Sequence, residues 1–316
     1  MAYAERGVIT AAESLLKEAG FTVSQTCCAR ASCFDFAARR AESLIFIKVQ
    51  PDLDNLSPND SLELRDIARS VSGASLLISE NSREKPLEDD TVYCRHDVSA
   101  VTLKTFENIA MRRTYPLVQA GPGGYYVEID AETIRRRRQE LGLSVGKMAE
   151  IVGISRRTLY GYERGLAKAS VTAAYNLVYT LGIPVAKTVN VFEKPRSRRK
   201  CKLLLTAKRM IEKNRLLVRI FRRSNRYRVT TVRKAPFDFV VTVPDRRMRI
   251  IGGVASERER ELERRVDEIL SVCRVVQAQS VFITDGTKPS NKEISCIDRE
   301  ELSKIKSPEE LISSVT

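Results

Sequence analysis

The stretch "FDFAARRAESLIFIKV" (residues 34–49) has a counterpart about two hundred residues later, "FDFVVTVPDRRMRIIGGV" (residues 237–254). Each begins Phe-Asp-Phe, passes through a polar turn and enters a second apolar run, which is the pattern of two strands joined by a short connection. Lys48 follows the apolar run of the first stretch, whereas Gly252 and Gly253 follow that of the second. These stretches decide the fold, because they indicate one α/β unit that the chain uses twice.

The elements expected around each stretch come in the same order. In the first half the pattern predicts a helix, three strands, a helix and a strand, at residues 4–19, 21–28, 33–39, 43–50, 57–73 and 74–80. In the second half it predicts the same series at residues 214–226, 227–233, 236–243, 247–254, 256–276 and 280–286. Matching landmarks lie 203 to 205 residues apart, from Asp35 and Asp238 to Ile78 and Ile283. We expect an internal duplication; the alternative is that two unrelated α/β domains share alternating patterns.

Composition limits the classes of protein that the chain can belong to. With 316 residues, 43% of them hydrophobic, it is long enough for two or three domains. It has no apolar run of the roughly 20 residues that span a bilayer, its N-terminus is charged rather than signal-like, and its seven cysteines lack a disulfide framework. We therefore expect a cytoplasmic protein, away from membranes. The net charge of +14 favours a polyanionic partner, most simply nucleic acid, but leaves ribosomal, tRNA-binding and membrane-surface roles open.

The central segment, residues 130–182, reads as four or five short helices, four of them with a recognisable cap and stop. Each of these four begins after a side chain that can cap it and ends at a glycine, which permits a left-handed turn. The expected caps are Asp130, Ser144, Ser155 and Ser170, and the expected stops are Gly142, Gly153, Gly165 and Gly182. Helices of two or three turns persist only when they pack against one another, so we expect a small helical bundle.

The spacing within this segment is more specific than the helices themselves. Counted from Val145, a small residue falls at the fifth position (Ala149), a glycine at the ninth (Gly153), and apolar or aromatic residues at the fifteenth and eighteenth (Leu159 and Tyr162). Two helices that meet near a right angle need a small residue at their contact and a glycine in their turn. The stretch "MAEIVGISRRTLYGYERG" (residues 148–165) resembles the helix-turn-helix of the Cro and lambda-repressor-like family, over about 55 residues. A generic helical bundle would not explain this spacing.

The resemblance implies which residues contact DNA. In that family the second helix of the pair, here residues 155–164, enters the major groove. Arg156 and Arg157 are suited to guanine, and Tyr160 lies one turn on; Gly161 falls where many family members carry another base-reading side chain. Residues better placed for phosphates set affinity rather than sequence. The full expected set is Ser144, Lys147, Ser155, Arg156, Arg157, Thr158, Tyr160, Arg164 and Lys168. The run of four arginines at 135–138 must point several ways, and we expect part of it to be solvated or paired with Glu132 and Glu140.

A basic arm at residues 194–234 holds seventeen lysines and arginines against one acid, Glu212. This excess is larger than the net charge of the whole chain, so the basic character is local. We expect a phosphate-tracking surface whose binding weakens steeply with salt; a solvated linker is the alternative for residues 194–200.

The order of elements, with Asp35 on the second strand and Lys48 on the third, resembles the restriction-endonuclease-like fold, which archaeal Holliday-junction resolvases also use. In such nucleases the aspartate and the glutamate of a Glu-x-Lys on the next strand hold Mg²⁺, and the lysine helps to position or activate the attacking water. Here Phe46 stands at the place of that glutamate, and the second copy keeps Asp238 but has glycines instead of the lysine. Glu13 or Glu18 on the first helix does not replace the missing ligand. We expect a degenerate site without catalytic residues, in which Asp35 satisfies backbone groups. Because neither copy is then held to a catalytic geometry, we attribute the lysine-to-glycine difference to independent sequence divergence of the two copies.

Other candidate sites are weaker. Cys27, Cys28, Cys33 and Cys94, with His96, could form a zinc or redox site, but they lack a Cys-x-x-Cys knuckle, and buried structural cysteine is commoner. "AGPGGYY" (residues 120–126) lacks the P-loop lysine and is expected to be a hinge. We therefore predict no metal and no cofactor.

Taken together, the chain resembles an archaeal family of predicted transcriptional regulators. The expected fold is multidomain α/β plus all-α: two degenerate restriction-endonuclease-like units around a central Cro-like bundle. The domain bounds are 1–113 (α/β), 114–129 (hinge), 130–185 (helix-turn-helix), 186–202 (basic linker) and 203–316 (second α/β copy).

This resemblance implies a sequence-specific regulator that binds double-stranded DNA as a homodimer in the nucleoid, with nuclease-like domains for dimerisation, sensing or extra DNA contact and an unknown effector. The alternatives are a Mg²⁺-dependent nuclease or junction resolvase with a rearranged site, and a protein that binds RNA or chromatin without specificity.

Overall fold

The computed structural model of the protein describes residues 2–193, 228–243, 248–255, 261–284, 286, 289–304 and 310. The chain forms two compact units that are not continuous in sequence. Unit 1 comprises residues 1–50, 55–77 and 192–316, and unit 2 comprises residues 51–54 and 78–191. The two copies of the predicted α/β unit therefore share one compact body. The basic arm up to Tyr227, with the helix expected at 214–226, lies outside the described residues.

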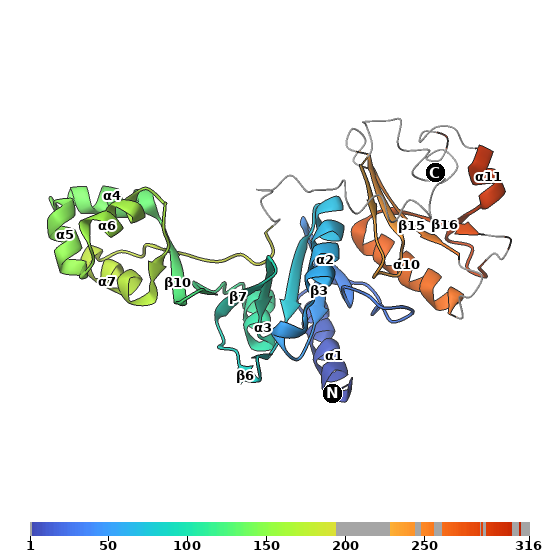
Figure 1. The fold of residues 1–316 in the computed structure, drawn as a ribbon, viewed down its shortest axis with the longest axis horizontal. Coiled ribbons are helices and arrows are strands. Elements are labelled where there is room, and N and C mark those ends of the chain that lie inside the picture. The colour runs from blue at the N-terminus through green and yellow to red at the C-terminus, as the bar shows by residue number, and fades with distance from the viewer. Residues whose placement is uncertain are drawn as a thin grey trace. The chain divides into compact units, whose positions relative to one another are not determined.

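The first copy has the predicted order of a helix, three strands, a helix and a strand (Figure 1). Strand β2 is antiparallel to both β1 and β3, and β4 follows β3 in the sheet. Leu64, Ile67 and Ala68 form the buried face of α2, and Ser57 caps that helix by accepting from the Asp60 amide. Its elements are α1 (Ala2–Glu18), β1 (Thr22–Val23), β2 (Phe36–Arg40), β3 (Ser43–Val49), η1 (Leu53–Asn55), α2 (Pro58–Ser70) and β4 (Ala74–Ile78).

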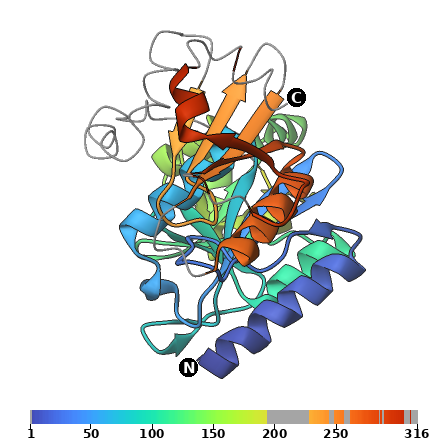
Figure 2. The same cartoon turned by 90° about the vertical axis from the view of Figure 1, so that its right-hand side faces the viewer.

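Among its described residues, the second copy forms a five-stranded sheet. Strands β13, β14 and β15 are antiparallel neighbours, and β16 and β17 continue the sheet in parallel. Helix α10 joins β15 to β16 and lies against both, as Figure 2 shows from the side. The elements are β13 (Arg228–Thr231), β14 (Phe239–Val243), β15 (Met248–Val254), α10 (Leu262–Val276), β16 (Gln279–Thr284), β17 (Ser295–Asp298) and α11 (Arg299–Lys304).

Backbone hydrogen bonds align the two Phe-Asp-Phe stretches residue by residue. The Asp35 amide donates to the Ile47 carbonyl and the Asp238 amide to the Gly252 carbonyl, both at 2.8 Å. The Val49 amide donates to Asp35 Oδ2 at 2.6 Å, and the Val254 amide donates to Asp238 Oδ2 at 2.7 Å. Residues 47 and 252, and 49 and 254, are therefore equivalent. Gly253 occupies the place of Lys48.

Packing explains why glycines stand on β15. A Cβ atom at Gly253 would lie 2.6 Å from Phe282 Cε2 and 2.9 Å from Ile269 Cδ1. A Cβ atom at Gly252 would lie 2.1 Å from Phe239 Cζ. Both distances to the rings are shorter than carbon atoms tolerate. From the sequence alone, we attribute the glycines to independent divergence of the two copies. Divergence alone does not account for Gly252 and Gly253, because the aromatic core of the second copy fills the space that a lysine side chain would need.

Unit 2 contains a second set of strands and the helical bundle. Its sheet order is β8-β7-β9-β10-β11, with β12 also paired to β10. The segment predicted as a hinge, residues 114–129, contains the antiparallel pair β9 and β10. Its elements are β5 (Asn81–Ser82), β6 (Lys85–Pro86), β7 (Thr91–Arg95), β8 (Val98–Val101), α3 (Leu103–Arg112), β9 (Val118–Gly121), β10 (Gly124–Ile129), α4 (Ala131–Glu140), α5 (Val145–Val152), α6 (Arg156–Glu163), β11 (Ala169–Ser170), α7 (Val171–Leu181) and β12 (Ala186–Lys187).

The four helices predicted between residues 130 and 182 are confirmed. The side chains of Asp130, Ser144, Ser155 and Ser170 accept amide hydrogens at the start of α4, α5, α6 and α7. Gly153 ends α5 with φ of 76°, a left-handed conformation that glycine adopts without strain. Ala149, Leu159 and Tyr162 are all buried in one core. The spacing seen in the sequence therefore builds a pair of short helices packed through a common core.

Gly253→Ala tests the packing on β15. We expect the substitution to destabilise unit 1 by about 1–3 kcal/mol, because the added methyl group must displace Phe282 and Ile269. Thermal unfolding followed by circular dichroism measures the change. Gly7→Ala is the matched control, since a Cβ atom there meets nothing within 4 Å, and it should be neutral or stabilising. An unchanged melting temperature for Gly253→Ala would contradict the packing argument.

Candidate DNA-binding interface

A buried ion pair holds α6 to α4. Arg138 Nε and Nη2 donate to the two carboxylate oxygens of Glu163 at 2.5 and 2.9 Å, and Arg138 Nη1 donates to the Leu143 carbonyl at 2.8 Å. The side chains of Arg138 and Glu163 are only 11% and 6% exposed. The hydrogen bond to Glu163 raises the pKa of Arg138. This two-pronged geometry fixes the orientation of α6 as well as its position.

The first turn of α6 is open to solvent. The Ser155 hydroxyl caps the helix by accepting from the Thr158 amide at 3.0 Å, and it lies 2.8 Å from Thr158 Oγ1. Arg156 and Arg157 follow the cap and are exposed. Within the described part of the chain, neither guanidinium makes a hydrogen bond or an ion pair. Two cations thus stand free at the end of the helix where the helix dipole adds positive potential.

Gly146 at the start of α5 makes room for the side chain of Arg156. This role of Gly146 was not predicted from the sequence. A Cβ atom on Gly146 would lie 2.8 Å from Arg156 Nε and 3.0 Å from its Cζ. The guanidinium of Arg156 therefore lies across the first turn of α5. A glycine within a short helix is the signal that could have pointed to this close approach.

The remaining predicted contact residues are placed differently from one another. Arg164 lies over the Tyr160 ring, with 4.4 Å between Cζ and the ring centroid, a cation–π arrangement. Lys147 pairs with Glu150 at 3.2 Å, and its amide donates to the Ser144 hydroxyl at 3.1 Å. Lys168 donates to the Gln119 amide oxygen. A Cβ atom on Gly161 would meet nothing within 4 Å, so the surface there is open.

The four arginines of α4 point several ways, as predicted. Arg136 and Arg137 pair with Glu140 at 3.9 and 3.0 Å, and Arg137 Nε donates to the Leu181 carbonyl at 3.1 Å. Arg135 is exposed. The sequence did not indicate Glu163 as the partner of Arg138, because the two residues are brought together only by helix packing.

The predicted degenerate nuclease site of the first copy is a closed ion pair. Lys48 Nζ lies 2.8 Å from Asp35 Oδ1, and the Val49 amide occupies Oδ2. Asp35 is 7% exposed. Phe46, at the place of the missing carboxylate, is fully buried against Phe34 with 5.2 Å between ring centroids. Protein donors thus engage both oxygens of Asp35.

In the second copy, two arginines pair with Asp238 in place of the missing lysine. Arg265 Nη2 lies 2.5 Å from Asp238 Oδ2, and Arg30 Nη2 lies 2.9 Å from Oδ1. Arg265 is 1% exposed and also donates to the carbonyls of Pro236 and Val254 at 2.6 and 3.1 Å. Asp238 therefore has the same backbone contact as Asp35 but a different source of positive charge.

Other candidate sites are not assembled in the described part of the chain. No three His, Cys, Asp or Glu side chains there lie close enough together to hold a metal ion. Cys27 and Cys33 are buried, and burial raises the pKa of both thiols. The helices described are also too short or too polar to cross a bilayer.

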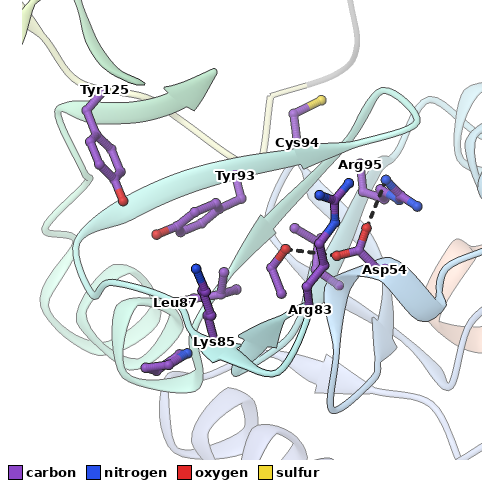
Figure 3. A pocket seen from close by; sticks show the side chains of 11 residues that line it. Asp54, Arg83, Lys85, Leu87, Tyr93, Cys94, Arg95 and Tyr125 are labelled. Atoms are coloured by element: carbon purple, nitrogen blue, oxygen red, sulfur yellow. Dashed lines mark hydrogen bonds and ion pairs between the residues drawn. The ribbon is translucent and has the colours of Figure 1, made fainter. Parts of the chain in front are cut away.

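A pocket of about 540 Å³ opens in unit 2 (Figure 3). Arg83 and the Asp54–Arg95 ion pair (3.1 Å) lie at one end, and Lys85 extends beside Tyr93 at the other. A hydrogen bond to Tyr93 raises the pKa of Tyr125 to about 12. The lining residues are Leu53, Asp54, Ser82, Arg83, Lys85, Pro86, Leu87, Tyr93, Cys94, Arg95 and Tyr125.

The turn that carries Arg83 is strained. Arg83 and Glu84 have φ of 50° and 65°, the conformation of a two-residue hairpin turn that usually contains Asn-Gly. Each such residue costs on the order of 1 kcal/mol when it is not glycine. Asp52 Oδ2 accepts from the Glu84 amide at 3.0 Å, a contact that lowers the pKa of Asp52, and Ser82 donates to Asp54 at 2.9 Å. These contacts hold the turn in place.

Comparison with known proteins places the chain among archaeal relatives. It is 32% identical to a protein of Methanococcoides burtonii over 302 residues, which cover 94% of this chain and 92% of that protein. A protein of Methanosarcina barkeri is 31% identical over 310 residues, covering 95% and 93%. One from Methanocaldococcus jannaschii is 30% identical over 286 residues, covering 90% and 88%. All three carry the name "Putative HTH-type transcriptional regulatory protein".

This chain belongs to that archaeal family of HTH-type transcriptional regulatory proteins. Two parts of it also match domain families. Residues 5–116 match the PD-(D/E)XK superfamily domain, and residues 134–187 match the helix-turn-helix family. The resemblances to a restriction-endonuclease-like fold and to a helix-turn-helix are thereby confirmed. In the complex of SinR protein with SinI protein, one chain is 25% identical, covering 17% of this chain and 53% of its own, with a TM-score of 0.17.

Glu163→Gln tests the buried ion pair of this regulator. We expect it to destabilise the helix-turn-helix by about 3–5 kcal/mol, because it leaves the Arg138 charge buried without its counterion. Hydrogen exchange of α4 and α6 amides measures the loss. Glu150→Gln, which removes an exposed pair with Lys147, is the control and should cost under about 1 kcal/mol. Equal effects of the two variants would contradict the structural role of Arg138.

Proposed function

We propose that the protein is a sequence-specific transcriptional regulator that reads double-stranded DNA with α6 in the major groove. The observation that supports this most directly is the first turn of α6, where Arg156 and Arg157 are exposed and free of partners among the described residues. The Arg138–Glu163 pair fixes that helix, so the two guanidinium groups are carried on a rigid element. Arginine forks match the two acceptors of guanine in the major groove.

Phosphate contacts complete the proposed interface. Ser144, Lys147, Arg164 and Lys168 flank α6 in sequence. The Lys147–Glu150 pair is exposed, and phosphate can replace Glu150 as the partner of that lysine. Contacts of this kind position the protein and carry no base preference. Tyr160 and Thr158 lie on the same helix and complete the reading surface.

A homodimer is part of the proposal. One recognition helix covers only a few base pairs, and proteins of this type gain specificity by reading two half-sites about one helical turn apart. Helix α7 carries Val171, Tyr175 and Tyr179, spaced four residues apart, and all three are exposed. This apolar stripe supports pairing through the helical bundle.

We further propose that the nuclease-like copies do not cut DNA. Mg²⁺ requires oxygen ligands that are available to it, and the oxygens of Asp35 and Asp238 are engaged by Lys48, Arg30, Arg265 and two backbone amides. Phe46 supplies no second carboxylate. The Mg²⁺-dependent nuclease remains the rival to be excluded by experiment.

Selection of binding sites from random duplex DNA at physiological salt tests the function. We expect a motif containing guanines, and we expect Arg156→Ala and Arg157→Ala each to weaken binding to it by about 1–3 kcal/mol and to relax the preference at one position. Arg136→Ala, which removes an exposed arginine of α4, should leave the motif unchanged. No motif, or a motif insensitive to both substitutions, would overturn the proposal. Cleavage of linear or branched DNA in Mg²⁺ that Asp35→Ala abolishes would instead establish the rival.

A further inference from the structure

The two copies in unit 1 contact each other through pairs of matching contacts. Glu268 Oε1, on the helix of the second copy, accepts from the Cys28 and Ala29 amides of the first copy at 2.7 and 2.8 Å. Glu63 Oε2, on the helix of the first copy, accepts from the Arg233 and Lys234 amides of the second at 3.2 and 2.9 Å. Residues 28 and 233, 29 and 234, and 63 and 268 each differ by 205. We call this pair of contacts the glutamate clasps.

A second pair of contacts repeats the relationship. Arg39 Nε on β2 donates to the Val275 carbonyl at 2.5 Å, and Thr242 Oγ1 on β14 donates to the Ser70 carbonyl at 2.8 Å. The donors differ by 203 residues and the acceptors by 205. These are the same offsets that align Asp35 with Asp238 and Ile47 with Gly252. Equivalent residues therefore exchange roles across the contact.

The aromatic residues at the centre are partners of their own equivalents. Phe34 and Phe237, which open the two Phe-Asp-Phe stretches, are fully buried with 6.1 Å between ring centroids. Around them, α10 of the second copy packs against β2 of the first, and α2 of the first packs against β13 and β14 of the second. A residue that meets its own equivalent marks a local twofold axis.

An interface in which residue i contacts j, and the equivalent of j contacts the equivalent of i, is the isologous interface of a twofold homodimer. Two similar domains that merely happened to touch would not bring equivalent residues together repeatedly. We propose that unit 1 is a fused dimer: the pairing surface of each nuclease-like copy is built for the other copy of the same chain. Its partner is thus the chain's own second half.

One contact breaks the symmetry and distinguishes the copies. Arg30 of the first copy reaches Asp238 of the second, but its equivalent by the same offset is Ala235, which cannot reach back. Asp35 already has Lys48, whereas Asp238 lacks that lysine because Gly253 stands there. If the first copies of two chains paired with each other, Arg30 of one would face Asp35 of the other, which is already paired with Lys48. Repulsion between Arg30 and Lys48 disfavours that pairing. The fused dimer therefore favours its own second copy over a copy from another chain.

The fused dimer limits how two chains can form the proposed homodimer, and in that respect it rests on the proposed function. Because the isologous surface is used within each chain, two chains must pair elsewhere. Each chain then contributes one helix-turn-helix and one complete fused dimer to the assembly.

Hydrogen exchange of the full-length protein, resolved to single amides by NMR, tests the glutamate clasps. Glu268→Ala should speed exchange at Cys28 and Ala29 about tenfold or more, and Glu63→Ala should do so at Arg233 and Lys234, because each loses its acceptor. Each substitution in one copy thus changes amide exchange in the other copy. A glutamate that only stabilised its own helix would not have this effect. Glu268→Gln keeps the accepting Oε1 and should retain protection, which separates loss of the acceptor from general unfolding.

Glu261→Gln is the control, because Glu261 is an exposed residue just before α10. It should leave the exchange rates of all four amides unchanged. Effects confined to the substituted helix would overturn the inference. Dilution supplies a second criterion. Protection at the four amides should not depend on protein concentration, whether or not the chain dimerises. Protection that falls on dilution would place these contacts between chains and contradict the fused dimer, while leaving the proposed DNA-binding function untouched.

The pocket of Figure 3 supports a second, independent inference. The side chains of Arg83 and Lys85 make no hydrogen bond or ion pair with any residue that the structure describes. The strained turn formed by Arg83 and Glu84 is held by Asp52 and Asp54. Backbone strain that is maintained by its surroundings is characteristic of ligand sites. The cavity of about 540 Å³ is within the range of small-molecule sites.

The lining indicates the class of ligand. Arg95 is paired with Asp54, so Arg83 and Lys85 are the lining cations without a protein partner among the described residues, and the pocket favours an anion. The rings of Tyr93 and Tyr125, with Leu87, offer a surface for a planar group (Figure 3). The geometry points to a site for a small organic anion that carries a planar ring, such as a mononucleotide.

Isothermal titration of the full-length protein with AMP, in the absence of DNA, tests this site. We expect AMP to bind more tightly than inorganic phosphate or adenosine, and Arg83→Ala and Lys85→Ala each to weaken it about tenfold or more. Lys104→Ala, an exposed lysine on α3, is the control and should have no effect. Absence of AMP binding, or binding that both substitutions leave unchanged, would overturn the inference. So would loss of duplex DNA affinity in these variants without AMP binding, since the cations would then belong to the DNA interface.

Discussion

A carboxylate withdrawn from water must be met by a cation and by hydrogen-bond donors, and this constraint organises unit 1. Asp35 and Asp238 each start from the same place, before the second strand of a copy, and each accepts an amide hydrogen from the third strand. In the first copy the cation is Lys48 on that strand. In the second, the cations come from α10 and from the first copy. The need to neutralise Asp238 thus joins the two copies through Arg30.

The same constraint operates in the helix-turn-helix. The side chains of Arg138 and Glu163 are both buried, and the charge of each offsets the cost of burying the charge of the other. Because α5 and α6 are eight residues each, they depend on such contacts and on their common core rather than on their own helical stability. The exposed arginines of α6 follow from this arrangement, since the helix is fixed by its inner face and its first turn is left free.

The proposed function and the nuclease-like architecture are connected through Asp35 and Asp238, whose oxygens are engaged by protein donors. A site that holds Mg²⁺ needs carboxylate oxygens open to the ion, whereas both aspartates here serve as internal anchors. This use of the aspartates is compatible with a regulator whose α/β part assembles rather than cuts. In the proposed fused dimer, the matched contacts around Phe34 and Phe237 give the second copy a role in assembly.

Much of the fold could be read from residues close together in the sequence. Caps and glycine stops located the four helices of the bundle, and the Phe-Asp-Phe stretches located the strand pairs, because these signals depend on local backbone geometry. The absence of a Glu-x-Lys at Phe46 likewise indicated a degenerate site from the sequence alone. The strands β9 and β10 were missed, since glycine, proline and tyrosine in residues 114–129 read equally well as a loop.

What the sequence determined by itself was therefore local: helix limits, strand pairs, the helix-turn-helix spacing and the candidate arginines of α6. Only the tertiary structure decided which distant charges meet, namely Arg138 with Glu163, Arg30 and Arg265 with Asp238, and each clasp glutamate with the opposite copy. The physical reason is that such pairs join residues from 25 to 240 positions apart. No local propensity specifies them, and they form only when whole elements pack.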